Sequence, residues 1–176
     1  MSEHKIRFFI TGAIGGQGGA VARQLLSAGY HANALARDLD NPSAHNLAKA
    51  GADLIVGDFD DIEALAKAAQ GCTGVFLNTS PDQPFETELQ HAQYVINASK
   101  SAGMTRIACA TVTRCEQFPD DFPSWMHQTP FIGYWTTKAA VQRAATDAGF
   151  QRWTILQPAF VMTNWIAPVS HMYWAD

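Results

Sequence analysis

A glycine-rich segment follows directly after the first apolar run of the chain. Residues 6–11 are mostly apolar, and residues 12–18 then read Gly-Ala-Ile-Gly-Gly-Gln-Gly, with a glycine at every third position. Residues 19–28 continue with apolar side chains at helical spacing. A strand, a glycine-rich turn and a helix in this order are typical of a site that binds the phosphates of a dinucleotide. The segment therefore predicts a nucleotide-binding α/β domain.

The three spaced glycines each have a physical reason to be there. Gly12 lets the strand turn sharply, Gly15 removes a side chain where a pyrophosphate approaches the backbone, and Gly18 permits close packing of the helix on the sheet. The free N–H groups and the positive dipole at the start of the helix attract phosphate. Ile14 and Gln17 lie in the same loop, and we expect them to contact the cofactor. The alternative is a glycine-rich turn without a ligand, whereas a P-loop is excluded because no Gly-Lys-Ser/Thr follows.

Strand and helix patterns alternate along the chain. Apolar runs predict strands at residues 6–11, 31–36, 53–56, 74–78, 106–111 and 152–157. Helical spacing predicts helices at residues 19–28, 43–50, 62–70, 87–102 and 133–148, and a proline-containing loop is expected at residues 114–131. Parallel strands need crossover helices, so the alternation predicts an α/β fold with a doubly wound parallel sheet of the Rossmann type, about six strands with helices on both faces.

Composition restricts the class of protein. The 176 residues suggest one domain, and 47% hydrophobic with 16% charged residues indicates a globular protein and not a disordered one. The net charge of −4 argues against nucleic-acid binding, because phosphate backbones require clustered Lys and Arg. The sequence shows no apolar run of about 18 residues and no secretory leader, so we expect a cytoplasmic protein without a membrane span.

The cysteines and histidines predict no metal site. An odd number of cysteines without a secretory signal indicates free thiols in a reducing compartment. We expect Cys109 in the core and Cys115 in a loop, with a structural role favoured over a reactive one. His91 and His127 lack the spacing to the cysteines that zinc sites use.

The end of the second predicted strand indicates which dinucleotide is bound. An NAD(H) site usually has Asp or Glu there, on the ribose hydroxyls. Here Ala36 and Arg37 occupy the position, and a guanidinium matches a 2′-phosphate in charge and geometry. Asp38 could serve a ribose instead, and Arg37 could be an ordinary surface side chain. The pattern favours NADP(H) over NAD(H).

Polar residues also follow the third and fourth predicted strands. Asp58 is placed to accept a hydrogen bond from an adenine amino group, with Phe59 beside it, and Asp61 is expected to cap the next helix. Asn78 and Thr79 end the fourth strand at the carboxyl edge of the sheet, where ligands bind in open α/β folds. Ordinary turn chemistry explains the same residues equally well.

Several segments in order resemble NmrA-like proteins, which are atypical members of the short-chain dehydrogenase/reductase superfamily. The matching segments are the loop 12–18, Ala36-Arg37, residues 57–61, residues 94–100, and residues 153–158 followed by Phe160 and Asn164. The resemblance implies NADP(H) or NAD(H) binding, in a family that contains reductases and non-catalytic redox-sensing regulators. It also implies a longer chain, so we expect residues 1–158 to form the dinucleotide-binding domain and residues 159–176 to start a truncated substrate lobe.

The resemblance draws attention to a Tyr-x-x-x-Lys pair. Tyr134 and Lys138 are four residues apart, which places them on one face of a helix. A lysine cation near a phenol favours its ionised form, so the tyrosine can act as acid or base. Short-chain dehydrogenases use such a pair with a Ser or Thr after the fifth strand, for which Thr111 and Thr113 are the candidates. Lys138 would also bind the nicotinamide ribose. The alternative role for Tyr134 is an aromatic anchor.

Two functions from different classes follow. The first is an oxidoreductase that transfers hydride between NADPH and a small apolar carbonyl or conjugated substrate. The second is a non-catalytic NADP(H) sensor that acts through a homodimer or a regulatory protein partner. A degenerate fragment without its own function is the third possibility. The apolar side chains Trp125, Met126, Phe131 and Trp135 could line a substrate pocket or form a face that a further lobe covers.

Overall fold

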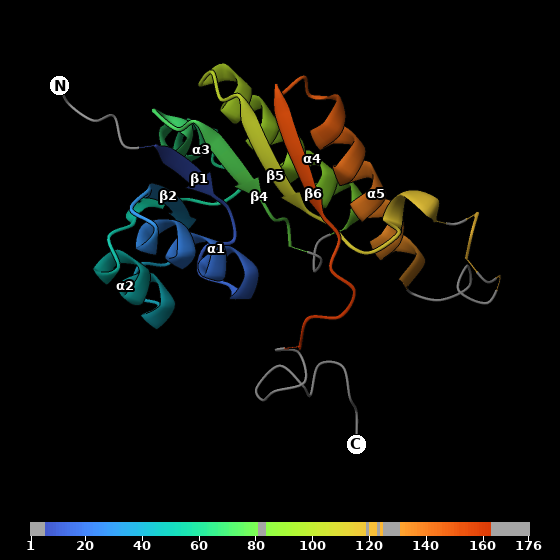
Figure 1. Ribbon diagram of the computed structural model, residues 1–176, viewed down its shortest axis with the longest axis horizontal. Coiled ribbons are helices and arrows are strands. Elements are labelled where there is room, and N and C mark those ends of the chain that lie inside the picture. Colours follow the sequence, from blue (N-terminus) through green and yellow to red (C-terminus); the bar gives the residue numbers. More distant parts are fainter. Residues whose placement is uncertain (1–5, 81–83, 119, 123, 125–130, 163–176) are drawn as a thin grey trace.

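The computed structural model describes residues 6–80, 84–118, 120–122, 124 and 131–162, which form one sheet with helices around it (Figure 1). Its strands are all parallel: β1 (Arg7–Ile10), β2 (His31–Ala36), β3 (Asp53–Val56), β4 (Gly74–Leu77), β5 (Arg106–Ala110) and β6 (Arg152–Leu156). The α-helices are α1 (Gly16–Ser27), α2 (Pro42–Lys49), α3 (Ile62–Ala69), α4 (Phe85–Ser101) and α5 (Phe131–Asp147). The strand order β3-β2-β1-β4-β5-β6 is the doubly wound order, so the predicted fold class is confirmed.

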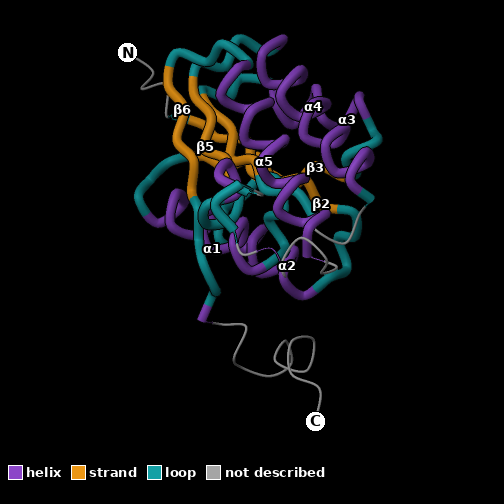
Figure 2. The backbone as a smooth tube through the Cα atoms, turned by 90° about the vertical axis from the view of Figure 1, so that its right-hand side faces the viewer, coloured by secondary structure: helices purple, strands orange, loops and turns teal. Residues whose placement is uncertain are grey.

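The helices cover both faces of this sheet (Figure 2). Ala22 of α1 and Leu47 of α2 are buried on one face. Leu65 of α3, Val95 of α4 and Val141 of α5 are buried on the other face, and all three are 0% exposed. Burying an aliphatic side chain of this size contributes about 1.5–3 kcal/mol, so the two apolar layers account for much of the stability. No described helix is long and apolar enough to cross a membrane.

Local capping explains where several helices begin and end. Asn41 begins α2 by accepting a hydrogen bond from the Ser43 N–H, and Asp61 begins α3 by accepting one from the Ala64 N–H at 2.9 Å. The predicted cap at Asp61 is confirmed. Gly29 follows the last turn of α1 with φ of +85°, the left-handed conformation in which glycine commonly ends a helix.

Most predicted boundaries differ from the structure by one or two residues, and two differences are larger. Helix α1 begins at Gly16 and not at Gly19. Glycine has a poor helix propensity, so the sequence pattern predicts a later start, but the packing of the turn overrides this propensity. A short 3₁₀ helix, η1 (Cys115–Gln117), lies inside the predicted loop and follows Arg114 at φ of +57°. A single turn of this kind is too short to show a period in the sequence.

Some predicted features fall outside the described residues. These are Trp125, Met126 and His127, the side chain of Phe131, and the part of the predicted tail at residues 163–176.

Candidate functional site

The candidate site lies where the chain reverses its winding direction, at the carboxyl ends of β1 and β4. Thr11 ties these two strand ends together and is 0% exposed. Its Oγ1 accepts a hydrogen bond from the Asn78 N–H at 2.8 Å and lies 3.1 Å from the Phe76 carbonyl oxygen. This is the switch point at which open α/β sheets bind ligands, so the glycine loop and Asn78 share one edge of the sheet.

The glycine loop is shaped by close backbone contacts. Gly12 has φ of +60°, and a Cβ there would lie 3.2 Å from Asn78 Nδ2. A Cβ on Gly18 would lie 2.4 Å from the Gly12 carbonyl oxygen and 2.5 Å from the Thr11 carbonyl oxygen. Gly15 is exposed and presents only backbone. The sharp turn predicted for Gly12 and the close packing predicted for Gly18 are both present.

The first turn of α1 has no side-chain cap. Gly15 is its N-cap residue and makes no capping hydrogen bond, whereas α2 and α3 are capped by side chains. Gly15, Gly16 and Gln17 are exposed, and Ile14 is half-buried. The N–H groups at this positive end of the helix dipole are therefore available to an anion such as a diphosphate.

Arg37 lies directly after β2, which neighbours β1 in the sheet. Ala36 is 2% exposed, while Arg37 is exposed and makes no hydrogen bond or ion pair with any described residue. The neighbouring carboxylate is already used, because Asp38 Oδ1 accepts a hydrogen bond from the Asp40 N–H at 2.8 Å. Of the two candidate side chains at this position, Arg37 and Asp38, only Arg37 has no partner among the described residues.

The loop after β3 is held by its own hydrogen bonds and by α4. Asp58 Oδ1 accepts hydrogen bonds from the N–H groups of Asp60 at 2.9 Å and Asp61 at 3.2 Å. Phe59 stacks on His91, with ring centroids 5.2 Å apart and an angle of 17° between the planes. His91 Nε2 in turn lies 3.2 Å from Asp60 Oδ1. Asp58 is exposed and a carboxylate has two acceptor oxygens, so this turn does not prevent it from binding a ligand.

Lys138 lies in a buried polar cluster with Thr79 and Glu88. Its Nζ is 2.6 Å from Glu88 Oε1, 3.2 Å from Thr79 Oγ1 and 3.4 Å from the Thr79 carbonyl oxygen. The Thr79 hydroxyl also donates to Glu88 Oε1 at 2.5 Å. The three residues are 2–4% exposed and join α4, α5 and the segment after β4. The three ammonium protons therefore have three acceptors inside the protein.

Sequence reasoning missed Glu88. A signal for it exists, because Glu88 shares the helical stripe of Ala92, Val95 and Ser99, all of which are buried on α4. A carboxylate on an apolar stripe predicts a buried partner of opposite charge.

Tyr134 lies one turn before Lys138 on α5. The Lys138 ammonium is 5.7 Å from the centroid of the Tyr134 ring, and the ring itself meets Trp135 edge-on at 5.2 Å between centroids. Tyr134 is half-buried. The contact between the two side chains is one of the Lys138 ammonium with the face of the Tyr134 ring.

The two threonines after β5 differ in their surroundings. Thr111 is 4% exposed, and its Oγ1 lies 3.4 Å from both Gln142 Oε1 and the Leu156 carbonyl oxygen. Thr113 is half-buried, and its carbonyl oxygen accepts a hydrogen bond from Trp135 Nε1 at 3.2 Å. The Thr111 hydroxyl therefore faces the fold interior, between α5 and β6.

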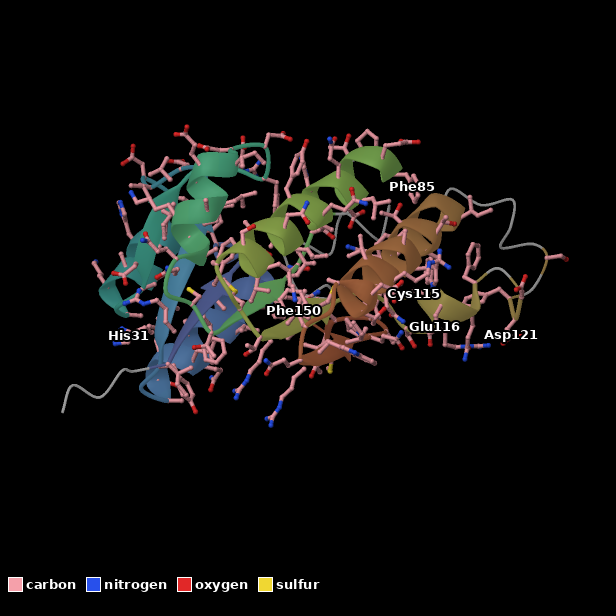
Figure 3. All side chains as sticks on the ribbon, turned by 90° about the horizontal axis from the view of Figure 1, so that it is seen from above. His31, Phe85, Cys115, Glu116, Asp121 and Phe150 are labelled. Carbon is pink, nitrogen blue, oxygen red and sulfur yellow. The ribbon has the colours of Figure 1, made fainter. Side chains whose placement is uncertain are left out.

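Cys115 lies in η1 beside α5, next to Glu116 (Figure 3). Its Sγ is 3.3 Å from Gln142 Oε1, which also accepts from Gln157 Nε2 at 2.9 Å. Burial raises the pKa of the Cys115 thiol, so the group is a neutral, enclosed thiol rather than a reactive one. The described residues contain no group of three or more His, Cys, Asp and Glu side chains that could hold a metal ion.

An open apolar hollow of about 500 Å³ adjoins the glycine loop. It is lined by side chains of α1, β4, β6 and the segment after β6, among them Gln17, Val21, Leu156 and Pro158.

These features agree with a match between the chain and a known family. Residues 12–170 match the family model described as NAD(P)H-binding. The chain belongs to this NAD(P)H-binding family. The glycine loop, the uncapped start of α1 and the strand ends at the switch point are thus parts of an NAD(P)H-binding domain.

Several curated relatives of this NAD(P)H-binding protein are NmrA-like, which confirms the predicted resemblance. The NmrA-like family domain-containing oxidoreductase FrzB of Cladobotryum sp is 25% identical over 166 residues, which are 90% of this chain and 47% of the relative. The corresponding oxidoreductase notA of an Aspergillus species is 31% identical over 148 residues, 80% of this chain and 42% of the relative. The chain spans about half the length of the curated relatives it matches.

Solved structures of similar fold include both an enzyme and a regulator. Triphenylmethane reductase of Citrobacter sp., in complex with NADP(H), has a TM-score of 0.72 and 22% identity over 92% of this chain and 52% of that one. NmrA, a negative transcriptional regulator, has a TM-score of 0.69 and 18% identity over 86% of this chain and 45% of that one. The NAD(P)H-binding fold therefore does not by itself decide between catalysis and regulation.

Proposed function

We propose that this NAD(P)H-binding protein binds NADP(H) in preference to NAD(H). The observation that carries the proposal is Arg37, an exposed guanidinium without a described partner directly after β2, the strand that pairs with β1. A 2′-phosphate would give it a charge-assisted, bidentate partner. Gly12, Gly15 and Gly18 would admit the diphosphate, and Ile14, Gln17, Asp58, Phe59, Asn78 and Thr79 would surround the rest of the cofactor.

We further propose that the protein is an oxidoreductase acting on a small apolar carbonyl or conjugated substrate. The bound cofactor supplies the hydride. The Tyr134 hydroxyl gives a proton to the substrate oxygen, and the Lys138 cation near the ring favours the phenolate that remains. Thr113 is the more accessible of the two threonines, and Thr111 must turn its hydroxyl away from Gln142 to hold a substrate oxygen.

NADPH oxidation with a panel of quinones, small ketones and enones tests this catalytic role. Tyr134→Phe should lower kcat by about two to four orders of magnitude, as expected for a lost general acid, and should leave the Kd for NADPH unchanged. Tyr30→Phe is the matched control, because Tyr30 packs edge-on against Phe8 and directly precedes β2, at the amino ends of the strands and not at the carboxyl ends that form the site. A wild-type protein that turns over no substrate, or a Tyr134→Phe variant with full activity, contradicts the proposal.

A non-catalytic NADP(H) sensor is the second candidate, and two observations favour it. The charge of Lys138 is already balanced by Glu88, and the Thr111 hydroxyl is turned into the fold. A sensor must bind the oxidised and reduced cofactor with different affinity, since equal affinity shifts no equilibrium. Calorimetry with NADP⁺ and NADPH, in the presence and absence of a recovered partner protein, tests this role. Equal affinities for NADP⁺ and NADPH, together with turnover of a substrate, would contradict the sensor role.

A further inference from the structure

We propose that Glu88 is a positioning residue that holds the Lys138 ammonium, charged and correctly placed, for the nicotinamide ribose of the bound cofactor. This inference rests on the proposed function, because it assigns Lys138 to the cofactor. It concerns the cluster of Lys138, Glu88 and Thr79 at the carboxyl end of β4.

The burial of the pair is the first argument. The side chains of Lys138 and Glu88 are 4% and 2% exposed, with Nζ and Oε1 2.6 Å apart. Moving two charges out of water is costly, and a buried ion pair often stabilises a fold no better than an apolar pair of the same volume. Fold stability alone is thus a poor reason to place this pair between α4 and α5.

The location of the pair is the second argument. Thr79 directly follows Asn78, whose backbone N–H is bound by Thr11 at the start of the glycine loop. Thr79 gives Lys138 two acceptors, Oγ1 and the carbonyl oxygen, and donates its own proton to Glu88. The ammonium is therefore fixed from two elements at the edge where the cofactor binds. Exchange of the longest contact, the 3.4 Å one to the Thr79 carbonyl oxygen, would free one proton for a ribose hydroxyl and leave the Glu88 contact intact.

The titratable surroundings of the ammonium make the inference testable by pH. Glu88 faces the ammonium from α4, and Cys109 faces it from β5. Tyr134 lies on the same helix as Lys138, with its ring centroid 5.7 Å from the ammonium. Burial raises the pKa of Cys109 to about 12, so this thiol remains neutral across the range in which binding is measured. Removing the Glu88 charge would leave a buried ammonium without a counter-charge, and burial disfavours the charged form.

The test is the pH dependence of NADPH affinity, measured by calorimetry from pH 6 to 10 for wild type, Glu88→Gln and Glu88→Asp. Near pH 6 we expect Glu88→Gln to bind NADPH with the affinity of wild type. As the pH rises, the variant should lose its affinity about one to three pH units before wild type does, which is the effect of one nearby opposite charge. Glu88→Asp keeps the charge and should keep the wild-type pH profile. A Glu88→Gln profile that coincides with that of wild type overturns the inference.

Two further arms separate this inference from the proposed function. Wild type that binds no NADPH at any pH defeats the proposed function, and the inference falls with it. If wild type binds NADPH and the pH profile of Glu88→Gln equals that of wild type, the inference is wrong while the proposed function stands. If Glu88→Gln does not fold, Thr79→Val is measured instead, since it removes one ammonium acceptor and keeps the carboxylate. It should shift the profile in the same direction, and an unshifted Thr79→Val profile then overturns the inference.

Discussion

Gly18 lies in van der Waals contact with the backbone of Gly12, so that a Cβ on Gly18 would lie 2.4 Å from the Gly12 carbonyl oxygen. The neighbouring atoms are backbone and cannot rotate away. The contact holds the first turn of α1 against the end of β1, and it fixes the shape of the loop that faces the cofactor.

Gly18→Ala should therefore destabilise the protein and weaken NADPH binding. Forcing a methyl group into a packed site typically costs about 1–3 kcal/mol, and here the displaced atoms belong to the binding loop. Gly16→Ala is the matched control, because a Cβ on Gly16 meets nothing within 4 Å and alanine favours the helix by up to about 1 kcal/mol. Urea unfolding measures both variants. Equal stability of the two would show that the loop adjusts freely.

The buried pair of Lys138 and Glu88 predicts strong coupling between two substitutions. Lys138→Met alone leaves a buried carboxylate without its partner, for which a loss of about 3–5 kcal/mol of unfolding free energy is typical. The double variant Lys138→Met/Glu88→Gln removes both charges and should regain most of that loss. A double-mutant cycle in urea gives the coupling, and additive losses would mean that the two side chains do not interact in solution.

The buried thiols predict a loss of stability at alkaline pH. Burial raises the pKa of Cys109 to about 12 and that of Cys72 to about 11, while the unfolded chain releases these protons near pH 9. Above pH 9 the unfolded state therefore binds fewer protons than the native state, and the unfolding free energy falls as the pH rises.

The thiol contribution is measured by comparing wild type with Cys109→Ala between pH 8 and 10. The Cys109 thiol should account for a loss of about 1–2 kcal/mol over this range. Cys109→Ala is expected to be less stable at pH 8 because of the cavity, but its stability should fall less steeply with pH. Parallel slopes for the two proteins would contradict the assignment to Cys109.

The fold could be predicted from the sequence because its signals are local. The apolar runs that form β2 and β3 match the structure at both ends, since each is bounded by residues that favour turns. The glycine loop was also predictable, because Gly12 and Gly18 each meet a backbone requirement within a few residues. The start of α1 was not predictable, because the glycines in its first turn have a low helix propensity and carry no apolar side chain that would show helical spacing.

The surroundings of the candidate catalytic residues could not be predicted in the same way. Lys138 and Thr111 were found from their spacing to Tyr134, but their partners come from distant segments of the chain. Glu88 lies 50 residues before Lys138, and Gln142 lies 31 residues after Thr111. Such contacts depend on the packing of α5 against α4 and β6, which no local pattern specifies.

The most direct test of the account is a fluorescence titration of the protein with NADPH and NADH, in wild type, Arg37→Ala and Arg106→Ala. We predict that wild type prefers NADPH and that Arg37→Ala loses about 10- to 100-fold in NADPH affinity, the equivalent of one charge-assisted contact, while its NADH affinity is unchanged. Arg106→Ala, an exposed arginine at the amino end of β5, should behave as wild type. Equal binding of both cofactors by wild type and Arg37→Ala, or no binding of either, would contradict the account.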